Sequence, residues 1–440
     1  MDFIPPKLPL PVEEYLAQFD DLMPAPAAQE KLRVYVAGLL SETRRKNIQA
    51  IAAKAVGTEY QAAHHFLADS PWDADALNRR RLSLLQKDPA TRIQSAGWFI
   101  QDDTGQVRKP GGTDAVARQY IGNVGKVADG LVTVTTHYAD AAKHYPITAD
   151  LYWPKATVEA LPEIERIPER QRDKIDIALD QIRWALKELA PRRPAGVTTD
   201  SWYGSSPKYL RALHEDIQIR YVAEIRGNRA VFAQFPGERG RPEHRAGELI
   251  TLFKAHDYRR VWVRRADGTS QTVWAAGMTL RVAKLPYRQR LVVVVDDRER
   301  PDPATARLLL SNDLRMTDAE IVQTYALRNW IEVFYEEAKD DLGFDQAEVR
   351  REARLRRHWM LVFLAHAMVQ SFRLRGSLSA WTRRKLATFD QALRCVQDLF
   401  RAEFWIRWIR QPEHWDFFVS WLRATRGLTL AAAAPANVTM

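Results

Sequence analysis

Residues 325–339, YALRNWIEVFYEEAK, are the most informative stretch of the chain. At about 100° per residue, a helix brings Tyr325, Arg328, Glu332 and Lys339 within about 60° of one another. A phenol, a guanidinium, a carboxylate and an ammonium then form one polar stripe. This stripe suits a phosphodiester that carries a metal ion, because the carboxylate can bind the metal while the cations hold phosphate oxygens. An exposed helix face with spaced ion pairs has the same pattern, so the spacing alone leaves both interpretations open.

The composition is that of a basic globular protein. The chain has 440 residues, too many for one ordinary core, and we expect two to four domains. It is 46% hydrophobic and 27% charged, as soluble globular proteins are. Its 65 Lys and Arg exceed its 55 Asp and Glu, giving a formal charge of +10 and a pI near 9.6. This excess favours a polyanionic partner, although a basic protein without nucleic acid would have the same balance.

Several protein classes are excluded. No N-terminal stretch has the basic start and apolar run of a signal peptide, and no apolar run could span a bilayer. The single cysteine, Cys395, excludes an intramolecular disulfide framework and a cysteine-based zinc cluster. We therefore expect a cytoplasmic protein that has no membrane partner.

The residue patterns outward from the opening segment predict an α/β protein with a mixed sheet. Strands are expected at 98–102, 131–136, 147–153, 197–200 and 217–224, and helices at 174–189 and 208–214. Further strands are expected at 260–265, 271–275, 280–283 and 291–295, with a hairpin turn at 266–268. The spacing of Thr317 and Glu320 is that of a capping box and predicts a helix start.

The same patterns divide the chain into five segments. They are a helical N-terminal DNA-binding domain (1–90), the first part of an α/β core (91–227), a β-rich insertion (228–311), the second part of the core with Glu332 (312–375), and a helical C-terminal region with a disordered tail (376–440).

Basic residues outside the opening segment are candidates for DNA contact. Arg44, Arg45 and Lys46 follow a predicted helix, although a solvated charged face is an equal alternative. Residues 122–126, GNVGK, resemble half of a phosphate-binding loop, but the neighbouring residues depart from that motif, so we expect no nucleotide cofactor. We interpret this segment as a turn before a strand, with Lys126 as a candidate phosphate contact.

The spacing Tyr325-(2)-Arg328-(3)-Glu332-(6)-Lys339 resembles the Y-(2)-R-(3)-E-(6)-K signature of a group of bacterial insertion-sequence transposases. This group belongs to the DDE superfamily, whose catalytic core is ribonuclease H-like. The resemblance selects Glu332 over Glu336, which lies on the same helix face. It also implies a cut-and-paste route in which a homodimer brings two DNA ends together. A bacterial source, and association with the nucleoid when the protein binds DNA, are further implications of the resemblance.

Two further motifs resemble those of the same family. Asp102-Asp103-Thr104 is similar to the first motif, an Asp two residues before Thr or Ser, and Thr199-Asp200-Ser201 is similar to the second. The long stretch between Asp200 and Glu332 fits the β-strand insertion for which this group is known. The resemblance thus implies a ribonuclease H-like mixed-sheet core, interrupted by a β-rich insertion and flanked by helical regions.

Two carboxylate pairs leave alternatives. Asp102 and Asp103 are adjacent on a strand and point to opposite faces, so both cannot serve equally; the family pattern favours Asp102. Asp296 and Asp297 also follow an apolar run, but they lie in the expected insertion and we interpret them as a turn.

The resemblance implies that Asp102, Asp200 and Glu332 are both the catalytic residues and the metal ligands. Three carboxylates predict two magnesium ions, for which manganese can substitute. Tyr325, Arg328 and Lys339 would bind DNA phosphates.

The implied reaction is that of a DNA transposase acting on double-stranded DNA. The protein would bind its terminal inverted repeats, excise the element and join the 3′-hydroxyl ends to target DNA. Trp262 and Trp274 are candidates to stack on a displaced base. The alternatives are a catalytically silent, transposase-derived DNA-binding regulator and a stand-alone nuclease.

Overall fold

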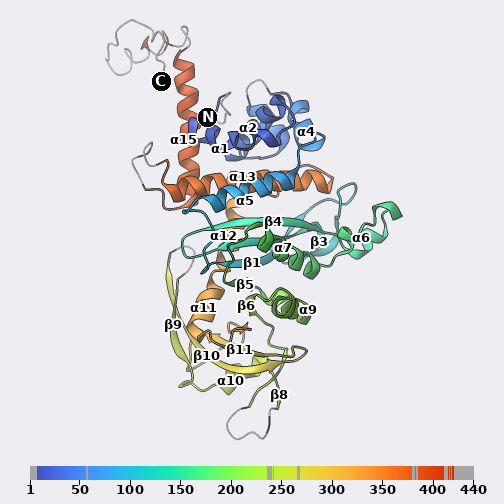
Figure 1. Ribbon diagram of the computed structural model, residues 1–440, viewed down its shortest axis with the longest axis vertical. Helices are drawn as coiled ribbons and strands as arrows, with labels where there is room; N and C mark the ends of the chain where they lie inside the picture. The colour runs from blue at the N-terminus through green and yellow to red at the C-terminus, as the bar shows by residue number, and fades with distance from the viewer. Residues whose placement is uncertain are drawn as a thin grey trace. The chain divides into compact units, whose positions relative to one another are not determined.

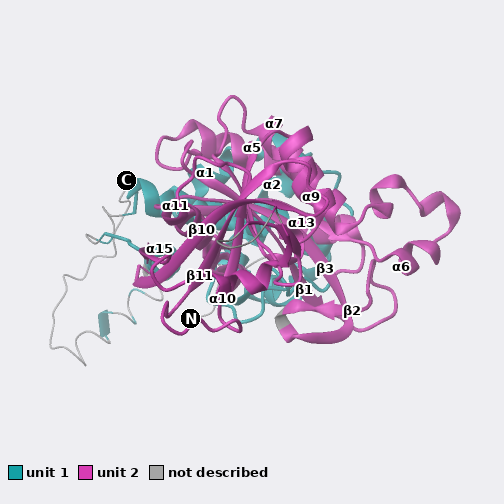
Figure 2. Ribbon diagram, turned by 90° about the horizontal axis from the view of Figure 1, so that it is seen from below, with its two compact units in different colours: residues 1–77, 339–348, 360–440 teal, residues 78–338, 349–359 magenta. Residues whose placement is uncertain are grey.

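The computed structural model describes residues 7–55, 58–234, 240, 242–264, 268–378, 382, 385–410, 415, 417, 419 and 420. The chain divides into two compact units, coloured separately in Figure 2. Unit 1 comprises residues 1–77, 339–348 and 360–440, and unit 2 comprises residues 78–338 and 349–359. None of the described helices is both long and apolar enough to cross a membrane.

Unit 1 is built from helices contributed by both ends of the chain. Its helices are α1 (Leu10–Ala17), η1 (Asp20–Leu22), α2 (Pro26–Leu40), α3 (Ile48–Lys54), α4 (Tyr60–Ala68) and α15 (Phe389–Arg410), while α5 (Ala74–Lys87), η7 (Glu337–Asp341) and α13 (Glu352–Arg375) contribute residues to both units. Helix α2 contains the predicted helix that precedes Arg44, and it buries Leu32, Tyr35 and Val36 at helical spacing. The Gln397 side chain of α15 donates to the Leu40 carbonyl at 3.1 Å. The predicted disordered tail lies outside the described residues.

Unit 2 is built on a mixed sheet of 12 strands (Figure 1). The strands are β1 (Trp98–Val107), β2 (Ala117–Ile121), β3 (Lys126–Ala139), β4 (His144–Tyr152), β5 (Gly196–Thr199), β6 (Arg220–Glu224), β7 (Ala230–Phe232), β8 (Glu243–Arg245), β9 (Arg259–Arg264), β10 (Ser270–Val282), β11 (Arg288–Val295) and β12 (Arg307–Ser311). The described helices that lie wholly in unit 2 are η2 (Gly122–Val124), α6 (Lys155–Glu159), η3 (Glu163–Glu165), η4 (Pro168–Gln171), α7 (Lys174–Glu188), α8 (Ser201–Gly204), α9 (Pro207–Arg211), η5 (Ala212–Asp216), η6 (Ala246–Glu248), α10 (Leu249–Leu252), α11 (Asp318–Ala326) and α12 (Asn329–Glu336). The predicted mixed α/β class is confirmed.

The centre of the sheet has β1 between an antiparallel and a parallel neighbour. Strand β3 pairs with the whole length of β1, whereas β5 pairs with only the first four residues of β1. The prediction ended this strand at Asp102, but the antiparallel ladder extends it to Val107. Asp102 is therefore the first residue of β1 beyond its parallel partner.

The segment predicted as a β-rich insertion continues the same sheet. Strand β12, which the sequence did not predict, pairs with β6 on one side and with β11 on the other. Two predicted strands, 271–275 and 280–283, form the single strand β10. A Cβ at Gly277 in its middle would lie 2.0 Å from an Asp318 carboxylate oxygen, so a larger residue would displace the Asp318 side chain at the start of α11. The turn predicted at 266–268 falls largely outside the described residues.

Local interactions define a turn and a helix start in unit 2. Residues 122–125 form the tight turn between β2 and β3, with Gly125 at φ +65°, and Lys126 begins β3. This confirms the interpretation of the segment as a turn. The side chain of Asp173 caps α7 by accepting from the Asp176 amide at 2.8 Å.

Helix α11, on which the signature segment begins, is fixed at its start. Thr317 and Glu320 form the predicted capping box. Two nitrogens of Arg290 on β11 contact one Asp318 carboxylate oxygen, at 2.8 and 2.6 Å. Ile321 and Val322 are buried in a core shared with β9, β10, β11 and β12.

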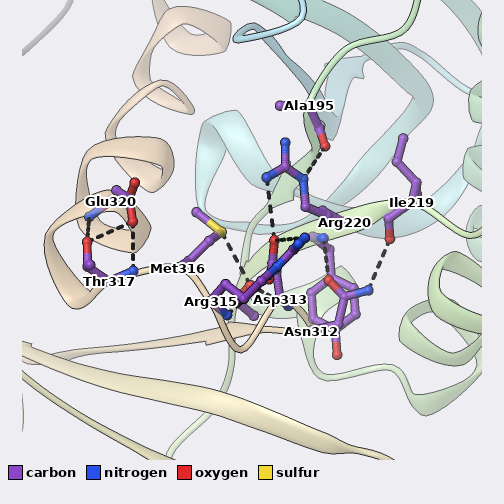
Figure 3. A network of polar contacts seen from close by, with 11 residues as sticks. Ala195, Ile219, Arg220, Asn312, Asp313, Arg315, Met316, Thr317 and Glu320 are labelled. Atoms are coloured by element: carbon purple, nitrogen blue, oxygen red, sulfur yellow. Dashed lines mark hydrogen bonds and ion pairs between the residues drawn. The ribbon is translucent and has the colours of Figure 1, made fainter.

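The connection from β12 to α11 is held by the polar network in Figure 3. Asn312 accepts from the Tyr221 amide at 2.8 Å and donates to the Ile219 carbonyl at 3.1 Å. Asp313 forms an ion pair with Arg220 of β6 at 3.5 Å. These bonds fix the segment between β12 and α11 against the start of β6.

Candidate active site

Strand pairing brings three acidic residues into one row. Gln101 of β1 lies opposite Thr199 of β5, and Thr199 lies opposite Ala223 of β6, in parallel registers. The residue that follows each of these three is acidic: Asp102 on β1, Asp200 directly after β5, and Glu224 at the end of β6. Since neighbouring parallel strands are about 4.8 Å apart and paired residues share a face, these carboxylates lie at one edge and on one side of the sheet. The strand order therefore places a candidate site at the carboxyl ends of the parallel strands β1, β5 and β6.

Arg328 connects the first of these carboxylates to the helix carboxylate. Its Nη2 lies 2.7 Å from Asp102 Oδ2, and its Nη1 lies 3.3 Å from Glu332 Oε1. Asp102 is 8% exposed, while the Glu332 side chain is 53% exposed. One partly buried guanidinium thus holds a buried and an open carboxylate beside each other.

Asp200 is oriented by the helix that follows it. Its Oδ1 accepts from the Trp202 and Tyr203 amides at 3.0 and 3.1 Å, which makes it the cap of α8. A Cβ at Gly204, the last residue of this short helix, would lie 2.0 Å from the Glu224 carbonyl oxygen. The glycine therefore permits close packing of α8 on β6 and fixes the loop that carries Asp200.

The structure corrects the assumption of one continuous helix through residues 325–339. Helix α11 ends at Ala326, α12 begins at Asn329, and a π-helical turn follows from Glu337. Arg328 lies in the turn between α11 and α12, and from there its guanidinium contacts both Asp102 and Glu332. In one regular helix, the direction of its side chain would instead follow from residue spacing alone. Glu332 lines the cavity described next; Glu336, its rival on the helix, is not among the residues that line it.

A cavity of about 940 Å³ lies beside the carboxylates. Its polar lining is Asp200, Ser201, Glu224, Gln271, Asp296, Thr305, Arg307, Tyr325, Arg328, Asn329 and Glu332. Apolar residues of β9, β10, β11 and α11 form much of the remaining wall. Asp296 lies in a bend after β11, as its interpretation as a turn predicts, and it adds another carboxylate to the cavity.

The charge balance of the site suits a divalent cation. Burial raises the pKa of Asp102 to about 8, and Asp200 and Asp103 contribute to the rise, although Arg328 opposes it. Burial also raises the pKa of Asp200, against the opposing effects of the Tyr203 amide and Arg328. The donors of Asp102, Asp200 and Glu332 are all carboxylate oxygens, which Mg²⁺ prefers. A divalent cation would offset their excess negative charge.

Asp103 lies on the opposite face of β1 and has its own partners. Its Oδ2 lies 3.2 Å from Lys174 Nζ and accepts from the Tyr203 hydroxyl at 3.4 Å. The Lys174 ammonium also lies 5.2 Å from the centre of the Trp202 ring. Asp103 thus contacts α7 and α8, and its carboxylate is already paired.

The other predicted site residues occupy different environments. Tyr325 is 5% exposed, and its hydroxyl donates to Glu224. Lys339 belongs to unit 1, whereas the carboxylates and Arg328 belong to unit 2. Its contact with the site therefore stays a prediction. Trp262 is 58% exposed with Arg260 5.3 Å from its ring, and Trp274 has Arg298 4.4 Å from its ring.

The predicted basic contacts also differ in exposure. Arg44 and Arg45 are exposed in the loop between α2 and α3, and Lys126 is exposed at the start of β3. Lys46, in contrast, is 3% exposed, and its ammonium donates to the Ser41 carbonyl. We therefore leave Lys46 out of the proposed DNA contacts.

Sequence reasoning missed Glu224 and Arg307. Glu224 ends a strand whose register matches those of Asp102 and Asp200, and this position at a strand end was its only signal. Arg307 begins β12, the strand that the sequence did not predict, and its guanidinium lies 5.7 Å from the centre of the Tyr325 ring.

Comparison with known proteins identifies the family of the chain. The family model for DDE superfamily endonucleases matches residues 18–278, which include Asp102 and Asp200 and end before Glu332. The chain is also 28% identical over 336 residues to a protein of Microchaete diplosiphon named a probable transposase for insertion sequence element IS701. That similarity covers 76% of this chain and 80% of the relative. With more than half of the chain matched and with a mixed sheet of ribonuclease H-like type, this chain belongs to the DDE superfamily of endonucleases, as a transposase of an insertion sequence.

Proposed function

We propose that this transposase binds the terminal inverted repeats of its insertion sequence, cuts the element out and joins its 3′-hydroxyl ends to target DNA. The observation that carries the proposal is the link from Asp102 through Arg328 to Glu332, beside Asp200 and a cavity of about 940 Å³. In such a site a phosphodiester can meet carboxylates and cations together.

Asp102, Asp200 and Glu332 would hold the metal ions. Nucleases of this family use divalent metals, and the oxygen donors suit two magnesium ions, with manganese as a substitute. When bound, two such ions supply activation of the attacking oxygen and stabilisation of the leaving oxygen in an in-line displacement.

The cations of the cavity would hold the substrate. Arg328 and Arg307 line it and would bind non-bridging phosphate oxygens, which become more negative as the displacement proceeds. Lys339 is proposed as a further phosphate contact, as the signature implies. The single proton of the Tyr325 hydroxyl is donated to Glu224, so we leave Tyr325 out of the proposed phosphate contacts.

The proposed reaction has two displacements at phosphorus. Water attacks a phosphodiester at the end of the element, and the P–O bond to the 3′ oxygen breaks and leaves a 3′-hydroxyl. That hydroxyl then attacks a target phosphodiester and displaces another 3′ oxygen, so the number of phosphodiester bonds is conserved in the second step. A homodimer would hold the two ends together.

A cleavage assay tests the proposal. A labelled duplex carrying the inverted repeat that flanks the coding region is incubated with the protein, with Mg²⁺ or with EDTA. A duplex with the repeat scrambled and the Glu332→Gln variant are the controls. We expect cleavage at the repeat boundary that requires Mg²⁺ and is absent in the variant.

The other outcomes contradict the proposal in different ways. Tight binding of the repeat without cleavage in any divalent metal would identify a DNA-binding regulator. Equal cleavage of the scrambled duplex would identify a stand-alone nuclease.

A further inference from the structure

Glu224 is a carboxylate of the active-site row that the three predicted metal ligands do not include. It ends β6, one residue after the last parallel pair, Thr199 with Ala223, and it lines the same cavity as Asp200. Its carbonyl lies against Gly204, where a Cβ would approach to 2.0 Å. The backbone of Glu224 is therefore fixed by the helix that Asp200 caps.

The side chain of Glu224 is engaged by the signature tyrosine. The Tyr325 hydroxyl donates a hydrogen bond to Glu224 Oε2. Tyr325 is 5% exposed, while Glu224 is half-buried at the cavity wall. A buried hydroxyl that loses its acceptor costs about 1–3 kcal/mol, so this bond holds the ring in one position.

Tyr325 in turn lies at the turn that aims Arg328. The Arg328 amide donates to the Tyr325 carbonyl at 2.9 Å, between the end of α11 and the start of α12. The guanidinium of the same Arg328 then contacts Asp102 and Glu332. A continuous path of bonds therefore runs from the end of β6 to two carboxylates of the predicted triad.

The two ends of α11 are held in different ways. Its start has the capping box and the Arg290–Asp318 contact, both outside the cavity. Its end has the Tyr325–Glu224 bond, inside the cavity. Loss of that bond would leave the helix anchored at its start and would free only the turn that carries Arg328.

We propose that Glu224 is a positioning residue of the transposase: it fixes Tyr325, and through the turn after Tyr325 it fixes Arg328 between Asp102 and Glu332. This inference rests on the proposed function for its effect on catalysis. The geometric claim concerns residues of this chain alone and has its own test.

The test uses the full-length protein with four changes: Glu224→Ala, Glu224→Gln, Tyr325→Phe and the double change Glu224→Ala with Tyr325→Phe. Tyr258→Phe is the matched control, because that buried hydroxyl also has one acceptor, the Ile250 carbonyl at 3.1 Å, outside the cavity. Glu248→Ala is the control for loss of a carboxylate elsewhere in unit 2. Thermal unfolding shows that each variant is folded.

The first readout is hydrogen exchange of peptides spanning residues 325–332, without DNA or metal. Glu224→Ala and Tyr325→Phe should each speed exchange there, while peptides of residues 317–321 should stay as in the wild type. Glu224→Gln should stay close to the wild type, because its amide oxygen still accepts from the hydroxyl. Unchanged exchange in folded Glu224→Ala would overturn the proposal, even if the wild type cleaves no DNA.

The second readout is the rate of repeat cleavage at saturating Mg²⁺. We expect a loss of about 10- to 100-fold for Glu224→Ala, as for other groups that orient a metal-binding residue. The double variant should lose no more than the worse single variant, because both changes break one bond. Both controls should match the wild type.

Cleavage data can also contradict the proposal while the transposase function stands. Losses that multiply in the double variant would show that Glu224 acts independently of Tyr325. A Glu224→Gln variant as slow as Glu224→Ala, with a higher Mg²⁺ requirement, would make Glu224 a metal ligand instead. Absence of cleavage in the wild type would contradict the proposed function, and the exchange readout would still decide on Glu224.

Discussion

Asp102 and Asp103 are neighbours on β1, yet their surroundings differ in charge balance. On the Asp102 face, one guanidinium, that of Arg328, serves both Asp102 and Glu332, and Asp200 lies in the same row. On the other face, Asp103 has Lys174 and a tyrosine hydroxyl to itself. Excess carboxylate charge creates an affinity for a cation, whereas a matched pair does not. The comparison teaches that the face of the strand, rather than the residue type, separates a predicted metal ligand from a structural ion pair.

The largest effect should come from removing charge on the Asp102 face. Asp102→Asn should lower the rate of repeat cleavage by more than about 10³-fold, because a lost metal ligand removes several kcal/mol of transition-state stabilisation. Asp103→Asn should lower it by about tenfold or less. Binding of the repeat, measured by gel mobility shift, should persist in both variants. Similar losses from the two changes would remove the distinction between the faces.

Metal binding without DNA sharpens the same comparison. Mg²⁺ should raise the unfolding temperature of the wild-type protein, because a ligand that binds only the folded state stabilises it. At 100 times the dissociation constant, the gain is about 2.7 kcal/mol. Asp102→Asn should lose this shift, and Asp103→Asn should keep it. A shift that survives in Asp102→Asn would place the metal elsewhere.

The Asp103 face should respond in stability rather than in metal binding. Lys174→Ala leaves a mostly buried carboxylate without its ammonium, and we expect a loss of about 1–2 kcal/mol in the free energy of unfolding. Adding Asp103→Asn to this variant should restore part of the loss. Denaturant unfolding measures both. Lys208→Ala is the control, since that ammonium is half-exposed in its pairs with Asp173 and Asp176 and should cost less than about 0.5 kcal/mol.

The smallest effect is expected outside both faces, at the β2–β3 turn. Lys126 is exposed, and Lys126→Ala should weaken binding of the repeat only a few-fold, with little change in the cleavage rate at saturating protein. Because one phosphate contact contributes about 0.9 to the salt slope, the slope of log affinity against log salt should fall by about one. An unchanged slope would mean that Lys126 does not touch the DNA backbone.

Much of the fold was predictable because its signals are local. The capping box at Thr317 and Glu320, the apolar stripe of α7 and the turn at Gly125 each depend on residues within one or two helical turns or one hairpin. The spacing from Tyr325 to Glu332 was equally local. The family resemblance that rests on this spacing selected Glu332, which lines the cavity and contacts Arg328.

The failures involve partners far apart in the chain. Strand β12 was missed, and the insertion was not expected to extend the core sheet, because its pairing with β6 joins residues about 85 positions apart. The burial of Lys46 also depends on distant chain: its amide donates to the Gln346 side chain at 2.7 Å within unit 1. No window of sequence contains both partners of such contacts.

The sequence by itself determined the residue types of the candidate site, the strands and helices that carry them, and the family that they resemble. Only the tertiary structure decided that Asp102 rather than Asp103 faces Arg328, that Glu224 joins the carboxylate row, and that a turn interrupts the signature helix. The physical reason is the range of the interactions. Periodicity and capping act between near neighbours in the chain, whereas strand register and the direction of a charged side chain depend on residues that meet only in the folded protein.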